Sequence, residues 1–444
     1  MSEKYIPSPE ETAEIKKNLN ASRYRMGFAQ LFFSGEESTL GGLKVMMIKM
    51  LGGNDMHLAI SGSFGGLVHF LQALSVPLLQ IFKSNKKAMA AALAIGVAGG
   101  ALLALTVLGG STGKMTSFFL WTFIVGIFIM ATATGIQTAV ENNWMGDLLP
   151  VNCLGWFSSV KSIISLVGMS VFAAMFGFIV DNFGNLTAAG VGIFGIVAIS
   201  HILAITLIWQ IPDREPKIKP LFKKGKLTGM NIKSPALWFY IAFYLLWTGG
   251  RSLFNTFVTI FLITEFKFGL LKINGLLIMG QIISCFMLWI LGKVSDKKGN
   301  RKLLALLSFI VGMGMFLYQL TPFLGLIPVF AVYIISGMAG LTHGMLVINY
   351  SLEIIPEVGR ATYNSFIRVV LGIWTIIVIN VGGVCARMLE KSNFSFDIFG
   401  KSYSRYHIMF AIGALMVVCS VIPLLLAGNR KIENIDDKDL QQKA

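Results

Sequence analysis

"LLALLSFIVGMGMFLYQL", residues 303–320, is an uninterrupted apolar stretch that is rich in Leu, Met, Ala and Gly. A helix of this length can cross the hydrocarbon core of a bilayer, because all its backbone hydrogen bonds are made within the segment. A strand of a membrane β-barrel would instead show about ten residues of alternating hydrophobicity. The stretch therefore predicts a membrane-spanning α-helix.

Stretches of the same kind recur along the 444 residues, which are 55% hydrophobic and only 13% charged. A soluble globular domain carries about 25% charged residues. Spans are predicted near residues 25–51, 57–82, 88–109, 116–141, 156–181, 187–210, 237–263, 270–292, 303–321, 325–350, 361–388 and 406–427. We therefore expect an all-α polytopic membrane protein with twelve transmembrane helices.

The longest polar interior stretch lies between the sixth and seventh spans and divides the chain six plus six. The predicted parts are an amphipathic N-terminal segment (1–23), a six-helix bundle (24–210), a central loop (211–236), a second six-helix bundle (237–428) and a tail (429–444). Loops after even-numbered spans hold about 16 Lys and Arg, against about 6 after odd-numbered spans, so both termini are expected in the cytoplasm. A capping box at Ser8, Pro9 and Glu11 predicts a short helix on the membrane surface, unless this segment is a solvated tail.

The two halves of the chain repeat each other. The matching segments are "ENNWMGDLLP" (141–150) with "VINYSLEIIP" (347–356), "SNKK" (84–87) with "SDKK" (295–298), and "SGEES" (34–38) with "TGGRS" (248–252). Many transporters are built from such duplicated bundles. The two six-helix bundles are therefore expected to be pseudo-symmetric copies.

The segment before residue 303, "GKVSDKKGNRK" at 292–302, resembles the cytoplasmic-loop signature of the major facilitator superfamily, G-x-x-x-D-[RK]-x-G-[RK]-[RK]. The matching residues are Gly292, Asp296, Lys297, Gly299, Arg301 and Lys302, with Asn300 where a basic residue is usual. In the first half the signature is degraded, because Asn85 and Ala88 replace its Asp and second Gly. With twelve spans, the basic central loop and the repeat, the resemblance covers nearly the whole chain. It implies the fold of that superfamily, with a latch between the two bundles at this loop.

The pseudo-symmetry predicts which residues take part in the latch. Asp296 should approach the cytoplasmic start of the fifth span, where "GWFSSVK" places Lys161. We expect either an Asp296–Lys161 ion pair or a Lys161 that extends to the membrane surface. Arg368 occupies the matching place in "TYNSFIR" of the eleventh span, and Arg360 lies in a segment expected to end a helix and to act in gating.

Two adjacent acids, Glu36 and Glu37, interrupt the first span. A charge at such a depth costs about 2.5–3.5 kcal/mol even on the insertion scale, so it needs a partner or a function. The resemblance implies that the first and seventh spans line the central cavity, and the repeat aligns Glu37 with Arg251. The acids are therefore candidates for proton coupling, for a structural ion pair with Arg251, or, in Glu37, for pairing with Lys44 further along the same helix. Glu36 is expected to contact a polar group of a neighbouring span or to stay protonated.

Other polar residues fall in spans that the resemblance assigns to the cavity. Each could simply make an interhelical hydrogen bond, but as a set they suggest a polar cavity. These candidates are Lys44, His69, Gln72, Gln137, Asn142, Thr248, Asn255, Gln281, His343, Trp374 and Asn380. His343 stands out because imidazole can exchange protons near neutral pH.

These features predict a secondary active transporter that moves a sugar, nucleoside or small organic acid by alternating access, with proton symport as the coupling mode. The alternatives are an exporter of amphiphilic compounds and, in another class, a non-transporting receptor or assembly protein. No enzyme motif is present, and the four cysteines lack ligand spacing, so neither a cofactor nor a metal site is expected. The expected partners are a small solute, H⁺ and the lipid bilayer. We expect no nucleic-acid partner, because the Lys and Arg residues that give the net charge of +15 lie in the loops between spans. We also predict a monomer in the bacterial inner membrane.

Overall fold

The computed structural model of the chain describes residues 9–39, 41–73, 81–111, 115–148, 151–211, 222–223, 226–227, 231–356, 360–392, 394–428 and 430–432. Within these ranges, the side chains of residues 9–23, 73, 142–143, 145–148, 151–159, 222–223, 226–227, 289, 292–293, 295–298 and 360–361 are outside the description. Every structural statement below refers to the described residues.

The N-terminal half is built from seven described helices. They are α1 (Pro9–Thr39), α2 (Gly42–Met50), α3 (Asp55–Ala73), α5 (Asn85–Gly110), α6 (Thr116–Leu148), α7 (Val151–Asn182) and α8 (Leu186–Trp209). Side chains cap three of these helices. Asn54 accepts hydrogen bonds from the Met56 and His57 amides at the start of α3. Ser84 accepts one from the Lys87 amide in α5, and Asn185 accepts one from the Ala188 amide in α8.

The C-terminal half repeats this arrangement. It contains α9 (Pro235–Thr264), α10 (Leu270–Lys298), α11 (Asn300–Phe316), a 3₁₀ turn (Leu317–Leu320), α12 (Thr321–Leu324), α13 (Ile327–Ile354), α14 (Arg360–Lys391), α15 (Arg405–Cys419) and α16 (Val421–Ala427). Two short antiparallel hairpins complete the described elements: β1 (Phe222–Lys223) with β2 (Lys226–Leu227), and β3 (Ser395–Ile398) with β4 (Lys401–Ser404).

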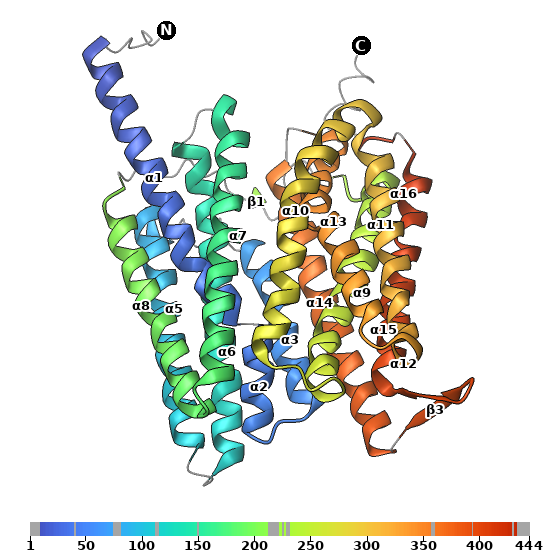
Figure 1. Ribbon diagram of the computed structural model, residues 1–444. Coiled ribbons are helices and arrows are strands. Elements are labelled where there is room, and N and C mark those ends of the chain that lie inside the picture. The colour runs from blue at the N-terminus through green and yellow to red at the C-terminus, as the bar shows by residue number, and fades with distance from the viewer. Residues whose placement is uncertain are drawn as a thin grey trace.

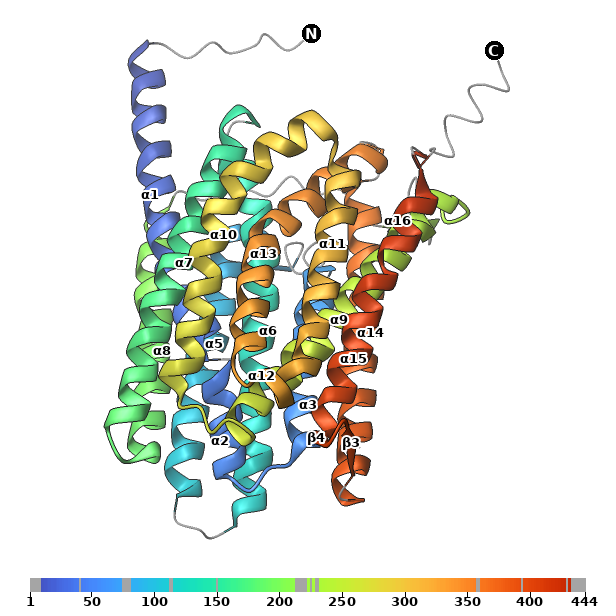
Figure 2. The ribbon, with the colours of Figure 1, turned by 45° about the vertical axis from the view of Figure 1, so that its right-hand side comes forward.

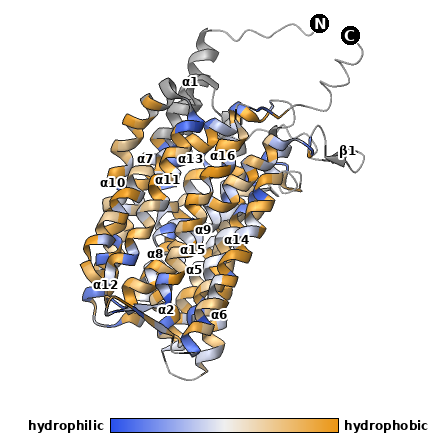
Figure 3. Cartoon of the chain, turned by 90° about the vertical axis from the view of Figure 1, so that its right-hand side faces the viewer, coloured by the Kyte–Doolittle hydropathy of each residue, from blue (hydrophilic) through white to orange (hydrophobic). Residues whose placement is uncertain are grey.

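The helices run side by side along one long axis (Figure 1). We call the end at which α1 begins and α16 ends the proximal end, and the end with the β3–β4 hairpin the distal end; a second view shows the same two ends (Figure 2). Apolar residues dominate the middle of the bundle, while polar residues gather towards its ends (Figure 3). Nine described helical stretches are long and apolar enough to cross a membrane. The other three predicted spans are not among these nine stretches. The first corresponds to α1 with α2, the second to α3 and the seventh to α9.

The first predicted span, 25–51, differs from the expectation because it is two helices. Helix α1 runs from Pro9 to Thr39, and α2 begins at Gly42 with Gly41 at its N-cap. Glycine weakens a helix by about 1 kcal/mol relative to alanine, so the Gly-Gly pair favours an interruption. Gly42 also packs tightly against α10, since an added Cβ would lie 2.5 Å from Cδ1 of Leu270. The N-terminal segment is likewise not a separate surface helix, because α1 continues through residue 23 into the span.

The two halves meet along two helix pairs, α3 with α14 and α7 with α10. Gly66 and Gly372 allow the α3 and α14 backbones to touch, because a Cβ on Gly66 would lie 2.5 Å from the Gly372 carbonyl oxygen. At the distal end, Asp181 of α7 accepts hydrogen bonds from the first two amides of α10, those of Leu270 and Leu271, at 3.0 Å each. The carboxylate thus caps a helix of the other half, where the helix dipole favours an anion.

Candidate functional site

Two adjoining cavities lie in the C-terminal half and share Arg251, Asn255 and Ser336. The first has a volume of about 290 Å³ and is lined mainly by α9 and α13, with Tyr244, Trp247, Thr248, Ser252, His343 and Gly344 among its other residues. The second, of about 330 Å³, extends to α10 and reaches Gly41 and Gly42 of the N-terminal half. Together they form a space that is lined by polar, aromatic and aliphatic side chains and extends to the boundary between the halves.

Arg251 is the cation of this space. Its Nη1 donates to Oγ of Ser336 at 3.2 Å, and its guanidinium lies 5.8 Å from the centre of the Trp247 ring. Among the described residues, no carboxylate lies within ion-pair distance of it. The expected pairing of Glu37 with Arg251 is therefore not formed in this conformation, because the two side chains face different parts of the protein.

His343 lies beside Arg251 and is almost fully enclosed. Its ring stacks on Trp247 with 3.5 Å between ring centres and 12° between planes. Its Nε2 is 3.3 Å from Oγ of Ser308 on α11. The imidazole is thus held on one face by an aromatic ring and at its edge by a hydroxyl, and it lines the first cavity.

The other cavity candidates divide into those that line this space and those that do not. Thr248, Asn255 and Gln281 line it, and Gln281 also accepts a 2.6 Å hydrogen bond from Ser170 of α7 across the boundary. Trp374 instead donates to the Leu245 carbonyl and lines an apolar groove.

Asn380 bonds to the Ile376 carbonyl of its own helix. Gln72 is half-buried and Gln137 is buried, but neither lines the two cavities, and the side chain of Asn142 is outside the described residues.

Glu36 is buried inside the N-terminal half. Its Oε2 lies 2.9 Å from Nε2 of His201 on α8, and Thr134 of α6 donates a hydrogen bond to its Oε1. Since Nδ1 of His201 donates to the Val197 carbonyl at 2.8 Å, the contact between Nε2 and Glu36 must contain a proton carried by one of the two groups. His201, which the sequence reasoning did not single out, also requires Gly96, where an added Cβ would lie 2.6 Å from Nε2.

Glu37, its neighbour, has an exposed side chain. Its charged surroundings are Glu36, Glu141 on α6 and Lys161 on α7. Lys161 forms an ion pair with Glu141 at 2.9 Å. Lys44 is not on the same helix as Glu37, because the helix is interrupted between them, and it makes no ion pair with a described residue.

The signature loop is only partly described. The side chains of Asp296, Lys297 and Arg360, and the burial of Gly292, lie outside the described residues, so the Asp296–Lys161 contact stays a prediction, beside the observed Lys161–Glu141 pair. Gly299 has a φ of +83° at the N-cap of α11, which explains a glycine at this position.

Arg368 and His69 were predicted at different sites, yet the structure brings them together. Nη1 of Arg368 on α14 is 3.3 Å from Nδ1 of His69 on α3. A guanidinium can only donate, so Nδ1 is the acceptor nitrogen of the imidazole. The contact joins the two halves on the proximal side of Gly66 and Gly372.

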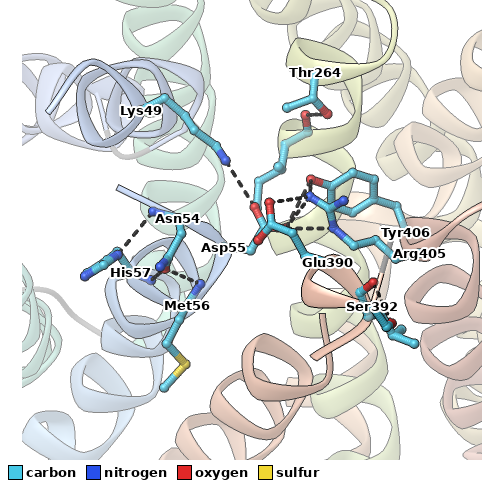
Figure 4. A network of polar contacts seen from close by, with 12 residues as sticks. Lys49, Asn54, Asp55, Met56, His57, Thr264, Glu390, Ser392, Arg405 and Tyr406 are labelled. Carbon is cyan, nitrogen blue, oxygen red and sulfur yellow. Dashed lines mark hydrogen bonds and ion pairs between the residues drawn. The ribbon is translucent and has the colours of Figure 1, made fainter. Parts of the chain in front are cut away.

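A charged network that sequence reasoning missed joins the halves at the distal end (Figure 4). Asp55 of α3 is fully buried, and its Oδ2 accepts from Nη2 and Nε of Arg405 at 2.9 and 3.1 Å. Its Oδ1 lies 3.2 Å from Nζ of Lys49. Tyr406 donates to Asp55 at 3.2 Å, and Glu390 accepts from Arg405 at 3.1 Å. We call these five residues the distal network.

A signal for the network was present in the sequence. Asp55 and Arg405 each lie immediately before a predicted span, the second and the twelfth, in loops that follow odd-numbered spans. Such loops share one side of the membrane, so the sequence places these two opposite charges on the same side, although it does not show that they meet.

Comparison with known proteins agrees with this architecture. The sequence matches the Major Facilitator Superfamily over residues 26–379. No curated protein sequence matches the chain. Similar solved structures include a mutant of the nucleoside transporter NupG, at 16% identity and a TM-score of 0.69, covering 92% of this chain and 100% of that one. A D-xylose-proton symporter matches at 12% identity and a TM-score of 0.69, covering 93% and 99%.

The inward-open xylose transporter XylE from E. coli matches at 13% identity and a TM-score of 0.68, covering 91% of this chain and 95% of that one. At these identities the likeness shows the fold. The fold and the family match define a multi-span membrane transporter and not an enzyme. The chain belongs to the major facilitator superfamily, which confirms the predicted twelve-helix fold.

Proposed function

We propose that this transporter carries a small organic acid and binds its carboxylate at Arg251. The observation that carries the proposal is the position of this guanidinium, which lines both cavities and has no carboxylate partner among the described residues. A guanidinium binds a carboxylate through two parallel hydrogen bonds. Ser336 holds the arginine, while Thr248, Asn255 and His343 offer hydrogen-bond groups to the rest of the solute.

Proton symport is the coupling mode that we propose, with Glu37 as the proton carrier. Its side chain is exposed and lies near Glu36, Glu141 and Lys161, which supports a carboxyl that can gain and lose a proton over one held in a fixed ion pair. Glu36 is enclosed with His201 and Thr134, which supports a structural role for that acid.

In an alternating-access cycle, one end of the molecule opens to the cytoplasm and the other to the outside. The excess of basic residues in loops after even-numbered spans supports a cytoplasmic proximal end. The distal network and the Asp181 cap then close the outer end, so the conformation is one that faces the cytoplasm. Transport requires these contacts to break and re-form in each cycle.

Uptake into proteoliposomes tests the solute. Radiolabelled organic acids, nucleosides and sugars are supplied to wild type, Arg251→Gln, Arg251→Lys and the control Arg387→Gln, whose arginine is exposed on α14. We expect acid uptake by wild type and the control, and at least about tenfold weaker apparent affinity in Arg251→Gln. Uptake of nucleosides or sugars that is unaffected by Arg251→Gln would contradict the proposed substrate class.

Proton movement is tested separately with a pH-sensitive dye inside the same vesicles. We expect Glu37→Gln to exchange labelled for unlabelled solute while it loses proton-driven accumulation. Glu265→Gln, which alters an exposed acid after α9, serves as the control. Accumulation that persists in Glu37→Gln and is lost in Glu36→Gln would assign the proton to the buried pair instead.

A further inference from the structure

A third cavity lies at the proximal end, well away from Arg251. It has a volume of about 320 Å³ and lies between the start of α11, the end of α13 and the segment after α16. It is lined by three cations, one acid and one phenol, together with Ile354 and Gly428; the charged and phenolic residues are Arg301, Arg430, Lys431, Glu353 and Tyr350. We call this space the basic pocket.

The cations of the basic pocket are available to a ligand. Nη1 of Arg301 is enclosed yet has no hydrogen-bond partner. None of the three cations forms an ion pair with a described residue. Glu353, the one acid in the lining, accepts a hydrogen bond from the side-chain amide of Asn300, and the three cations outnumber its single negative charge. An unpartnered guanidinium nitrogen inside a pocket indicates a site for an anion.

The chain after α16 is held so that its two cations reach the pocket. Gly428 ends α16 with a φ of +59°, a conformation that glycine adopts without strain. Four residues later, the buried Ile432 donates its amide to the Ile354 carbonyl of α13 at 2.9 Å. Arg430 and Lys431 lie between these two anchors, with the Arg430 guanidinium 5.7 Å from the centre of the Phe239 ring.

The start of α11 adds to the positive potential. Gly299 is the N-cap of this helix and has no side chain that could cap it. The positive end of a helix dipole attracts an anion within the first turn. Arg301 is the second residue of the helix, so its charge and that of the helix start act on the same region.

The surroundings of the basic pocket indicate the kind of anion. Leu425 and Leu426 of α16 are 63% and 59% exposed, and Leu352 of α13 is 46% exposed. In a membrane protein, such an apolar surface faces acyl chains, while cations at the edge of the apolar band face headgroups. A phosphate diester matches both the guanidinium geometry and this position at the boundary.

We propose that the basic pocket binds a phosphate group, supplied by an anionic phospholipid headgroup or by free phosphate. Bound there, the phosphate contacts α11 and the segment after α16, whose ends otherwise repel each other through their cations. This site is independent of the solute cavity and of the coupling mode.

Thermal unfolding of the full-length protein in a neutral detergent tests the proposal. The additives are phosphatidylglycerol, phosphatidylcholine at the same mole fraction, and inorganic phosphate against chloride at the same ionic strength. We expect phosphatidylglycerol to raise the unfolding temperature and phosphatidylcholine to leave it unchanged. If inorganic phosphate alone gives the same shift and the lipid adds nothing, the phosphate site stands and its ligand is free phosphate.

The deciding variant is the double replacement Arg430→Gln with Lys431→Gln, in which both replaced side chains are exposed. We expect it to need about tenfold more phosphatidylglycerol for the same shift. Lys391→Gln with Lys401→Gln, two exposed lysines near the distal end, is the matched control and should respond as wild type. Equal responses of the deciding variant and wild type, or equal protection by both lipids, would overturn the proposal. Arg301→Gln is expected to lose the response as well.

Discussion

Asp55→Asn should release the distal end of the two halves. The carboxylate is fully buried and binds Arg405 through two hydrogen bonds of 2.9 and 3.1 Å, with Lys49 at 3.2 Å. Asparagine keeps the shape and one acceptor oxygen but removes the charge that both cations share. The change therefore weakens the contact between the halves without creating a cavity.

The magnitude follows from burial. Removing one partner of a buried ion pair costs about 3–5 kcal/mol. Arg405 and Lys49 are 22% and 30% exposed, so both cations regain some hydration, which favours the lower end of that range. About 3 kcal/mol corresponds to roughly a 100-fold shift in the ratio of distal-open to distal-closed molecules.

Distance measurement between two spin labels detects this shift. The labels replace Phe118 on α6 and Leu324 on α12, exposed residues near the distal end of each half, in a protein whose native cysteines are changed to serine. We expect Asp55→Asn to populate longer distances, while the exposed-acid control Asp397→Asn keeps the wild-type distribution.

The double variant with Arg405→Gln should resemble either single variant, because all three break one contact. Unchanged distances in Asp55→Asn, in a sample with the wild-type unfolding temperature, would refute a role of the distal network in closing this end.

Two further variants test contacts described above. Gly96→Ala places a Cβ 2.5 Å from Cδ2 of His201 and should lower the free energy of unfolding by about 1–3 kcal/mol. Gly195→Ala is the control, because an added Cβ there meets no atom within 4 Å, and it should leave the stability unchanged. Equal unfolding temperatures of the two variants would contradict the tight packing around Gly96. Asp181→Asn weakens the cap on α10 by about 1 kcal/mol. The same spin labels should therefore show a smaller opening than in Asp55→Asn. An equal or larger opening would contradict the conclusion that the Asp55 contact is the stronger of the two.

The apolar stretches predicted the helices well because a bilayer leaves a chain few choices. Each span must satisfy its own backbone, so length and apolar composition suffice to find it. The interruption after Thr39 escaped this reasoning, because the first span was located from its length and overall apolar character alone. The close packing of Gly42 against Leu270 of α10 became visible only in the folded chain.

Partners of the charged residues were harder to predict. Helical periodicity separates Glu36 from Glu37 by about 100°, but it does not say which helix each one faces. Glu36 meets His201 of α8, and the charged surroundings of Glu37 include Glu141 and Lys161, whereas the repeat alone had suggested Arg251. The repeat relates equivalent positions in the two halves, and equivalence about a pseudo-twofold axis does not require contact.

Composition, length and local motifs were enough to predict the membrane class, most of the spans, the division into two halves and the family. Which charges meet became known from the folded chain, as with Asp55 and Arg405, which are separated by 350 residues. Rotation of each helix about its axis and the choice of neighbouring helix arise from the packing of all the helices together. The position of a residue along its own helix predicts neither the rotation of that helix nor its neighbours. The cavity around Arg251 and the basic pocket therefore became visible only in the folded chain.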